Sequence, residues 1–493
     1  MPNTVSATII GCVAAYLAVC FLVGLWAMRR THSSSDFFLA GRSLGPLVVV
    51  FAAMSSVMSG FGFVGGPGLV FDSGSSSFWM VFAAGFGMPF GAVLVGKRLR
   101  LLAESRDILT LPDAVAARYG GRWPRGMMAA ALLLGVLGYL GTQIMAIGLV
   151  LVAVFNVSLP VALLIGLGVL AFYSIAGGMI ASVYTDVFQG ALMIVASLAV
   201  FYYALRAGGG LSSMSETLWA MDPAFLGPWG TRGPLNAMSW FLLFAVGSVG
   251  QPHSITKFMM LRHIPDLRWT GLLTGPTYAV LALLWVSIGL AMRTLVERGL
   301  QPPLDTPDLA APVFLKNYTP ELLAGIVFAG LLAAVMSTAD SFLNIGAAAA
   351  VRDLPTALFG RPLRRELFWS RLATGVILAA AALFALYMEN LVALLGTFGW
   401  GTFAAAIVPS VAIGLNWKRA TGTACVVSIG LSVVLNFSLE LAARHSIYSL
   451  PHGMNVGCFS MLISLAVFVG VSWMSSAPAD ERIAPDVRAA MEV

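Results

Sequence analysis

The sequence predicts an all-α protein that crosses a membrane about thirteen times. Hydrophobic residues make up 59% of the 493 residues and charged residues only 10%, whereas a soluble domain carries roughly 25% charge. A surface with so few charges is not stable in water, so lipid must cover most of it. The chain also contains many apolar runs of the length that one transmembrane helix needs, about 20 residues. These two observations predict a protein of the lipid bilayer.

Thirteen apolar segments account for most of the chain. They cover residues 5–28, 45–70, 77–96, 126–155, 158–175, 179–204, 237–261, 271–292, 323–349, 369–388, 391–416, 421–440 and 454–475. The first segment has no basic residues before it and no small-residue cleavage site after it, so we expect a span and not a removed signal peptide.

The basic residues indicate how these segments cross the membrane. When the loops are numbered alternately, one set holds 22 of the 28 Lys and Arg residues and the other holds 6. Because basic residues accumulate in cytoplasmic loops, we expect a multi-pass protein of the cell membrane with its N-terminus outside and its C-terminus in the cytoplasm. The same distribution argues against a nucleic-acid partner, and nothing in the sequence requires a protein partner.

Two of the segments contain helix-breaking sequences at matching places. Residues 55–60 read Ser-Ser-Val-Met-Ser-Gly and are followed by four more glycines and a proline up to position 68, and residues 247–252 read Gly-Ser-Val-Gly-Gln-Pro. Unwound backbone is tolerated in a membrane only where it is buried in protein or lines a cavity, and paired interruptions of this kind are typical of transporter binding sites. They lie five segments apart, which fits an inverted repeat because an odd number reverses the orientation. The sequence therefore predicts a transporter with broken helices at spans 2 and 7.

Only two acidic side chains, Asp186 and Asp340, lie well inside the apolar segments. A charged group at this depth is costly and indicates a functional site. No Lys or Arg is expected deep in any segment to pair with them, so a cation, a proton or hydrogen-bond donors must compensate. The ninth segment adds polar residues at spacings of three and four, which places them on one side of a helix: Ser337, Thr338, Asp340, Ser341 and Asn344. Oxygen ligands of this kind suit a hard cation such as sodium.

The histidines argue against an enzyme. They are scattered over separate loops and span ends, at His32, His253, His263, His445 and His452. A membrane enzyme needs a clustered nucleophile and base, or a set of metal ligands, and we expect neither here.

Several longer motifs resemble those of one transporter family. They lie at residues 36–45, 53–60 with 65–68, 177–186 with 189, 250–253 with 258–259, and 333–341. On these motifs the sequence resembles the sodium/solute symporters, which include the sodium/proline, sodium/glucose, acetate, pantothenate and sialic acid transporters. The resemblance implies a LeuT-type fold of two inverted five-helix repeats, transport by alternating access, and co-transported sodium.

The resemblance also divides the single transporter domain, residues 1–493, into parts. These are the first span and its cytoplasmic loop (1–44), the first repeat (45–204), the second repeat (237–416), two C-terminal spans (417–475) and a cytoplasmic tail (476–493).

Two cation sites follow from the resemblance. The common sodium site would take backbone carbonyls and hydroxyls from the second and ninth spans, namely from Ser55, Met58, Ala334, Ser337 and Thr338. A second cation site would share Ser337 and would add Asp186, Asp340 and Ser341. A carboxylate at 340 departs from members that carry a hydroxyl there, and it could strengthen the second site or carry a proton.

The resemblance also implies that the solute binds near the middle of the membrane, between spans 2, 4, 7 and 11. Its expected lining consists of Ser56, Ser59, Phe61, Gln143, Phe244, Ser248, Gln251, Phe398 and Trp400. Gln143 resembles the acetate-type branch, and the N–H groups of a half-helix favour anions, so a small monocarboxylate is the first expectation. A neutral amino acid of the proline type is the second, although Val57 replaces an acidic residue of the proline transporters. A proton-coupled carrier that uses Asp186 and Asp340 is the closest alternative on the same fold.

Overall fold

The computed structural model of the protein describes residues 6–28, 44–106, 108–388, 392–476, 478 and 483–493. Within these ranges, the side chains of residues 23–24, 27–28, 56, 173, 176–185, 188–189, 388 and 393 are not described. The described part contains no β-strand, and its one isolated bridge joins Leu44 to Leu261. The prediction of an all-α protein is confirmed.

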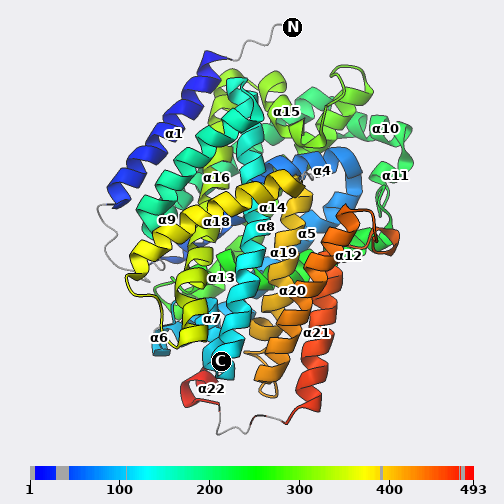
Figure 1. Cartoon of the computed structure of the whole chain (residues 1–493). Helices are drawn as coiled ribbons and strands as arrows, with labels where there is room; N and C mark the ends of the chain where they lie inside the picture. The colour runs from blue at the N-terminus through cyan, green and yellow to red at the C-terminus, as the bar shows by residue number, and fades with distance from the viewer. Residues whose placement is uncertain (1–5, 29–43, 107, 389–391, 477, 479–482) are drawn as a thin grey trace.

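Helices follow one another along the described part of the chain (Figure 1). The first half contains α1 (Ala7–Met28), α3 (Pro46–Val57), α4 (Gly66–Ser73), α5 (Phe78–Gly91), α6 (Lys97–Arg106), α7 (Leu111–Tyr119), α8 (Arg122–Phe155), α9 (Leu159–Gly208), α10 (Leu211–Met221), α11 (Pro223–Leu226) and α12 (Pro234–Gly247). The second half contains α13 (Pro252–Phe258), α14 (Leu267–Glu297), α15 (Ala310–Tyr318), α16 (Glu321–Ala348), α17 (Leu354–Phe359), α18 (Glu366–Met388), α19 (Val392–Ile407), α20 (Gly422–Arg444), α21 (Val456–Met474) and α22 (Pro485–Met491).

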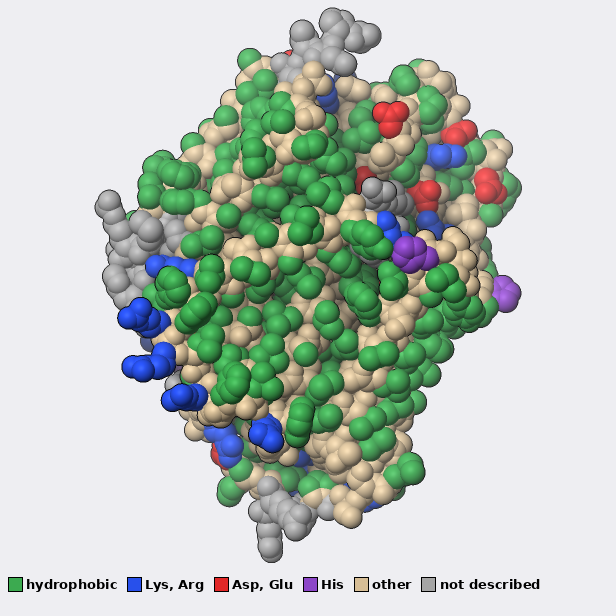
Figure 2. All heavy atoms as spheres, in the orientation of Figure 1, with side chains coloured by type: hydrophobic (Ala, Val, Ile, Leu, Met, Phe, Trp, Pro, Cys, Tyr) green, Lys and Arg blue, Asp and Glu red, His purple; other side chains and the backbone are tan. Residues whose placement is uncertain are grey.

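The surface and the helix lengths are those of a multi-pass membrane protein. Nine helices of the described part are long and apolar enough to cross a membrane, and three shorter apolar helices accompany them. Large apolar side chains point outward, as with Leu164 and Leu383, which are 77% and 71% exposed. Figure 2 shows hydrophobic side chains over the middle of the molecule, with Lys and Arg gathered toward the lower left. The total of thirteen spans stays a prediction.

One helix differs from the predicted segments. The sequence predicts separate spans at 158–175 and 179–204, whereas α9 is continuous from Leu159 to Gly208. Between Pro160 and Asp186 the chain has no further proline and no charged residue that would end a helix. The first part of α9 packs on α1, where the rings of Phe21 and Phe172 stack at 4.3 Å.

Two helices, α14 and α16, each pack on several other helices inside the molecule. α16 packs on α1, α8, α9 and α18, and α14 packs on α4, α5 and α9. The apolar stretch of α16 is 78% buried inside the protein, while that of the outer helix α18 is only 28% buried. The polar stripe of α16 therefore faces protein and not lipid.

Candidate functional site

The first interruption lies between α3 and α4. α3 ends at Val57, and Met58 leaves the helical conformation with ψ near 72°. A π-helical turn, Phe61–Gly65, then leads into α4. Only glycine fits at two of these positions, because an added Cβ at Gly60 would lie 2.4 Å from the Ala146 Cβ atom, and one at Gly66 would lie 2.3 Å from the Trp285 ring. The glycines of this motif thus let neighbouring helices approach the unwound backbone.

The second interruption lies between α12 and α13. α12 ends at Gly247, a 3₁₀ turn follows, and Gln251 is extended with φ −84° and ψ 113° before Pro252 starts α13. The Gln251 amide donates hydrogen bonds to the carbonyls of Gly247 (3.0 Å) and Trp400 (3.3 Å). These bonds satisfy backbone groups that the interruption leaves without helical partners.

Three residues of the predicted cation sites meet in one buried cluster. The Ser55 hydroxyl lies 3.3 Å from an Asp186 carboxylate oxygen and 3.1 Å from the Ser337 hydroxyl. These side chains come from α3, α9 and α16, and each is at most 1% exposed. We call this group, together with Lys257, the carboxylate cluster.

Lys257 corrects the expectation that Asp186 has no basic partner. Its ammonium nitrogen lies 2.9 Å from an Asp186 carboxylate oxygen and 2.5 Å from the Ala52 carbonyl oxygen, and the lysine is 1% exposed. The expectation was wrong because the charge count assigned Lys257 to a cytoplasmic loop. The signal lay in Pro252, which starts α13. This short helix holds Lys257 inside the protein.

The other residues of the predicted cation sites lie along α16. The Thr338 hydroxyl donates to the Ala334 carbonyl at 2.8 Å, and the Ser337 hydroxyl does so at 3.2 Å. The Asn344 amide donates to an Asp340 carboxylate oxygen at 3.4 Å. Thr338, Asp340 and Ser341 are all buried, as is Met58 at the end of α3. Hydroxyl and carboxylate oxygens therefore follow one face of α16 beside the first interruption.

Polar residues predicted to line the solute lie beside the backbone that follows the first interruption, where the helix resumes. The Gly60 N–H donates to the Gln143 side-chain oxygen at 3.0 Å, and the Phe61 N–H donates to the Ser59 hydroxyl at 3.3 Å. The Gln143 amide in turn lies 3.3 Å from that hydroxyl. The side chain of Ser56 lies outside the described residues. Ser59, Phe61 and Gln143 thus form one group beside the backbone interruption.

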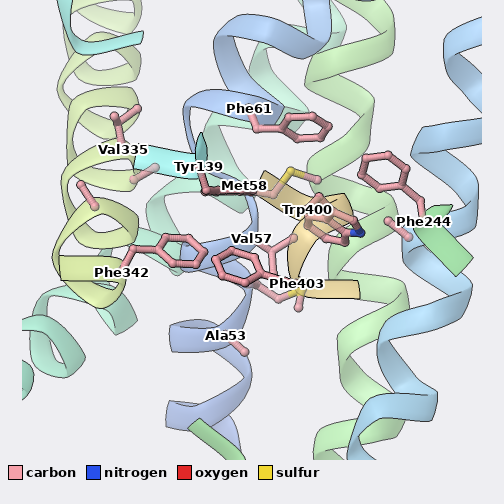
Figure 3. Close-up of a cluster of buried hydrophobic side chains, with 14 of the residues drawn as sticks. Ala53, Val57, Met58, Phe61, Tyr139, Phe244, Val335, Phe342, Trp400 and Phe403 are labelled. Carbon is pink, nitrogen blue, oxygen red and sulfur yellow. The ribbon is translucent and has the colours of Figure 1, made fainter. Parts of the chain in front are cut away.

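An aromatic cluster lies next to this group (Figure 3). The ring of Phe61 lies 5.6 Å from Phe244, 6.3 Å from Trp400 and 5.5 Å from Trp285, and Phe244 and Trp400 stack at 4.8 Å. Among the described residues, the indole nitrogens of both tryptophans and the side-chain oxygen of Gln251 have no hydrogen-bond partner. Buried polar atoms normally have partners, so this cluster has the bonding capacity that a solute needs.

Trp285 was not predicted, because one tryptophan in an apolar helix gives no signal of its own. The contact between its ring and Gly66 becomes evident only in three dimensions.

Two predicted solute residues behave differently from this cluster. Ser248 donates its hydroxyl to the carbonyl of Phe244, which keeps it next to the aromatic cluster. The Phe398 ring instead lies against Phe384 (5.8 Å) and Phe437 (6.4 Å), which belong to α18 and α20. Phe398 therefore contacts the neighbouring helices and not the rings around Phe61.

A loop beside the N-terminus of α19 packs directly on α4. Asp308, in the turn Pro307–Leu309, accepts a hydrogen bond from the Val392 N–H at 2.8 Å, and an added Cβ at Gly68 would lie 2.8 Å from its other oxygen. Burial raises the pKa of Asp308 to about 7, the Val392 bond opposes this rise, and the charge of Asp72 adds to it. This carboxyl group connects the loop, α4 and the start of α19.

Two interrupted helices beside a buried group of oxygens and charges define a class of protein. In secondary transporters, discontinuous helices form the binding sites for the substrate and the coupling ion. The fold agrees with that class: a solved structure of a Na⁺-coupled sialic acid symporter matches with a TM-score of 0.76 and 18% identity, over 96% of this chain and 99% of that one.

Sequence comparison then identifies the family. The sodium:solute symporter family model matches residues 37–429, and the chain belongs to this family. Its relatives include the osmoregulated proline transporter OpuE of Bacillus subtilis (26% identity, 94% of both chains) and the sodium/proline symporter of Escherichia coli (30%, 82% of both). The sodium/pantothenate symporter of Escherichia coli is 26% identical over 94% of this chain and 96% of its own. The protein is therefore a sodium-coupled solute transporter and not an enzyme.

Proposed function

We propose that this protein imports a small solute with a carboxylate group and an apolar body, driven by sodium, and that L-proline is the first solute to test. The observation that carries this proposal is the aromatic cluster, where the indole N–H groups of Trp285 and Trp400 have no hydrogen-bond partner among the described residues. Such N–H groups can donate to a carboxylate, and the rings of Phe61, Phe244 and Trp400 suit an apolar ring.

Two features favour L-proline over a simple monocarboxylate such as acetate, which the sequence ranked first. The aromatic faces can also attract the ammonium group of an amino acid, and acetate has no group that would use them. Relatives across most of the chain are named as proline transporters. A small monocarboxylate remains the second candidate, supported by Gln143 beside the Gly60 N–H.

The proposed ion sites use the oxygens beside the first interruption. The main sodium site would be formed by Ser55, Met58, Ala334, Ser337 and Thr338, and the second cation site by Asp186, Asp340 and Ser341. Each sodium ion that moves inward gains about 2.3 kcal/mol per 100 mV of membrane potential. We also propose that the chain crosses the membrane thirteen times, with inverted repeats at 45–204 and 237–416 broken at spans 2 and 7 and with its N-terminus outside.

A small pocket with a mainly apolar lining offers the ion a way out on the side of α7. It is lined in part by Thr110, Thr256, Asn344 and Asp353. Asn344 donates to Asp340, and Asp353 accepts a hydrogen bond from Thr110 at 2.9 Å. The pocket thus continues the polar face of α16 toward the end of the molecule where α7 lies, which we propose is the cytoplasmic end.

The test is uptake of labelled L-proline and of labelled acetate into proteoliposomes. We expect L-proline to accumulate under an inward sodium gradient and not under a matched choline gradient. Accumulation that follows a proton gradient and ignores sodium would contradict the proposal and favour a proton-coupled carrier. Sodium-driven accumulation of acetate alone would show that acetate, and not L-proline, is the solute, and it would leave the proposed sodium coupling in place.

A further inference from the structure

The position of Lys257 is that of a cation inside the proposed ion site. Its ammonium group contacts an Asp186 carboxylate oxygen and the Ala52 carbonyl oxygen, at 2.9 and 2.5 Å. The hydroxyl of Ser55 lies on the other oxygen of the same carboxylate. An ammonium group is a compact single positive charge, so its oxygen surroundings are of the kind that a sodium ion also prefers.

We propose that Lys257 is a tethered cation that occupies Asp186 whenever sodium does not, so that the ammonium group and sodium alternate on this carboxylate. This inference rests on the proposed sodium coupling through Asp186. A transporter must return with its ion site empty, and a buried carboxylate without any cation is strongly unfavourable. Lys257 removes that penalty in the empty state.

Sodium and the ammonium group would exclude each other at Asp186. Two like charges in contact with one carboxylate repel strongly inside a protein. The lysine has a flexible four-carbon stem, so its head can leave the carboxylate while the backbone of α13 stays in place. Sodium binding would then convert a lysine-bound Asp186 into a sodium-bound one.

The contact with Ala52 connects this exchange to the interrupted helix. Ala52 belongs to α3, which ends five residues later at Val57. When the ammonium group leaves, α13 and α3 lose one direct bond between them. Release of Lys257 by sodium would therefore loosen the second interrupted helix from the first, as the inward or outward opening of the site requires.

The experiment is a sodium titration of thermal stability with sodium as the only added ligand and choline as the replacement ion. Lys257→Gln removes the competitor, so we expect its half-saturating sodium concentration to fall by about tenfold or more, within the usual range of coupling between two ligands. Lys257→Arg keeps the charge and serves as the matched control, with no such fall. Unchanged or weaker sodium binding in Lys257→Gln would overturn the inference.

A second measurement uses the unmodified side chains in case Lys257→Gln does not fold. In wild-type protein labelled with carboxyl-¹³C aspartate, sodium should shift a carboxylate band in the infrared difference spectrum against choline. Carboxylate bands that ignore sodium would contradict the exchange. The two proposals fail differently: a wild-type protein without any sodium effect contradicts both, whereas a sodium effect that Lys257→Gln does not strengthen contradicts only the exchange at Lys257.

Discussion

The carboxylate cluster includes Ser55, before the first interruption, and the aromatic cluster includes Phe61, after it. The two clusters differ in how many of their polar atoms have partners. In the carboxylate cluster, Asp186 is surrounded by an ammonium group and a hydroxyl. In the aromatic cluster, the indole nitrogens of Trp285 and Trp400 and the oxygen of Gln251 lack partners among the described residues. One region is balanced by the protein's own charge, and the other leaves polar atoms for a ligand.

This difference separates two kinds of binding. A buried charge must always be compensated, so the ion region needs a substitute for sodium during part of the cycle. A buried indole N–H costs much less when it is unpaired, so the solute region can wait empty. Substitutions in the first region should therefore affect folding and ion binding, and those in the second should affect the solute alone.

The largest effect is expected from Asp186→Asn. It leaves the Lys257 ammonium buried without its carboxylate, and breaking a buried ion pair in this way costs about 3–5 kcal/mol of folding free energy. Chemical unfolding of the purified variant in detergent measures this loss. The double variant Asp186→Asn with Lys257→Gln removes both charges and should recover much of the stability. A double variant as unstable as the single one would show that the pair carries no such charge penalty.

The next effect is expected from Ser337→Ala combined with Thr338→Ala. The pair removes two hydroxyl ligands from the proposed main sodium site, so the sodium concentration for half-maximal uptake should rise by about tenfold or more. Thr374→Ala is the matched control, because Thr374 is also buried and donates to a backbone carbonyl of its own helix, that of Ser370, at 2.9 Å. Unchanged sodium dependence in the double variant would remove these hydroxyls from the ion site.

A smaller and more selective effect is expected from Trp400→Phe. The ring is kept and only the indole N–H is lost, so the KM for L-proline should rise by about five- to tenfold, as for one lost hydrogen bond of roughly 1 kcal/mol. Sodium titrations of stability without solute should be unchanged. Trp417→Phe, at a tryptophan that packs near Phe468 and Trp473, provides the control. A shift in sodium binding without a shift in KM would break the separation of the two regions.

A separate effect concerns Asp308 and pH. Its pKa of about 7 lies above the value of an exposed carboxyl, about 4, so the native state binds a proton that the unfolded state has lost. Stability should therefore fall as pH rises from about 4 to 7 and level off above that. Asp308→Asn should flatten the fall in melting temperature over this range, and the loop variant Asp305→Asn should not. Identical pH profiles for wild type and Asp308→Asn would contradict this assignment.

Sequence patterns predicted which residues form the ion region, but they did not predict the positive charge that balances Asp186. The spacing of polar residues in 337–344 and the depth of Asp186 indicated residues that the fold does bring together, since Ser55, Asp186 and Ser337 are in contact. Lys257 was missed because membrane depth was judged from segment ends, and the short helix α13 places it inside the protein. A linear count of basic residues cannot detect such burial.

The solute region was less predictable for a physical reason. Aromatic residues are common in apolar helices, so only the packing of separate helices reveals which rings meet. Phe244 and Trp400 were predicted and lie beside Phe61, whereas Trp285 was missed and Phe398 packs against α18 and α20. Contacts between distant helices leave little trace in the local sequence pattern.

The most direct test of the account is whether sodium and solute stabilise the purified protein together. Melting temperatures would be measured with L-proline, acetate and other small carboxylates, each in sodium and in choline buffer at several pH values. We predict a solute that raises the melting temperature in sodium and has little effect in choline. A solute whose effect depends on pH and is indifferent to sodium would contradict the account.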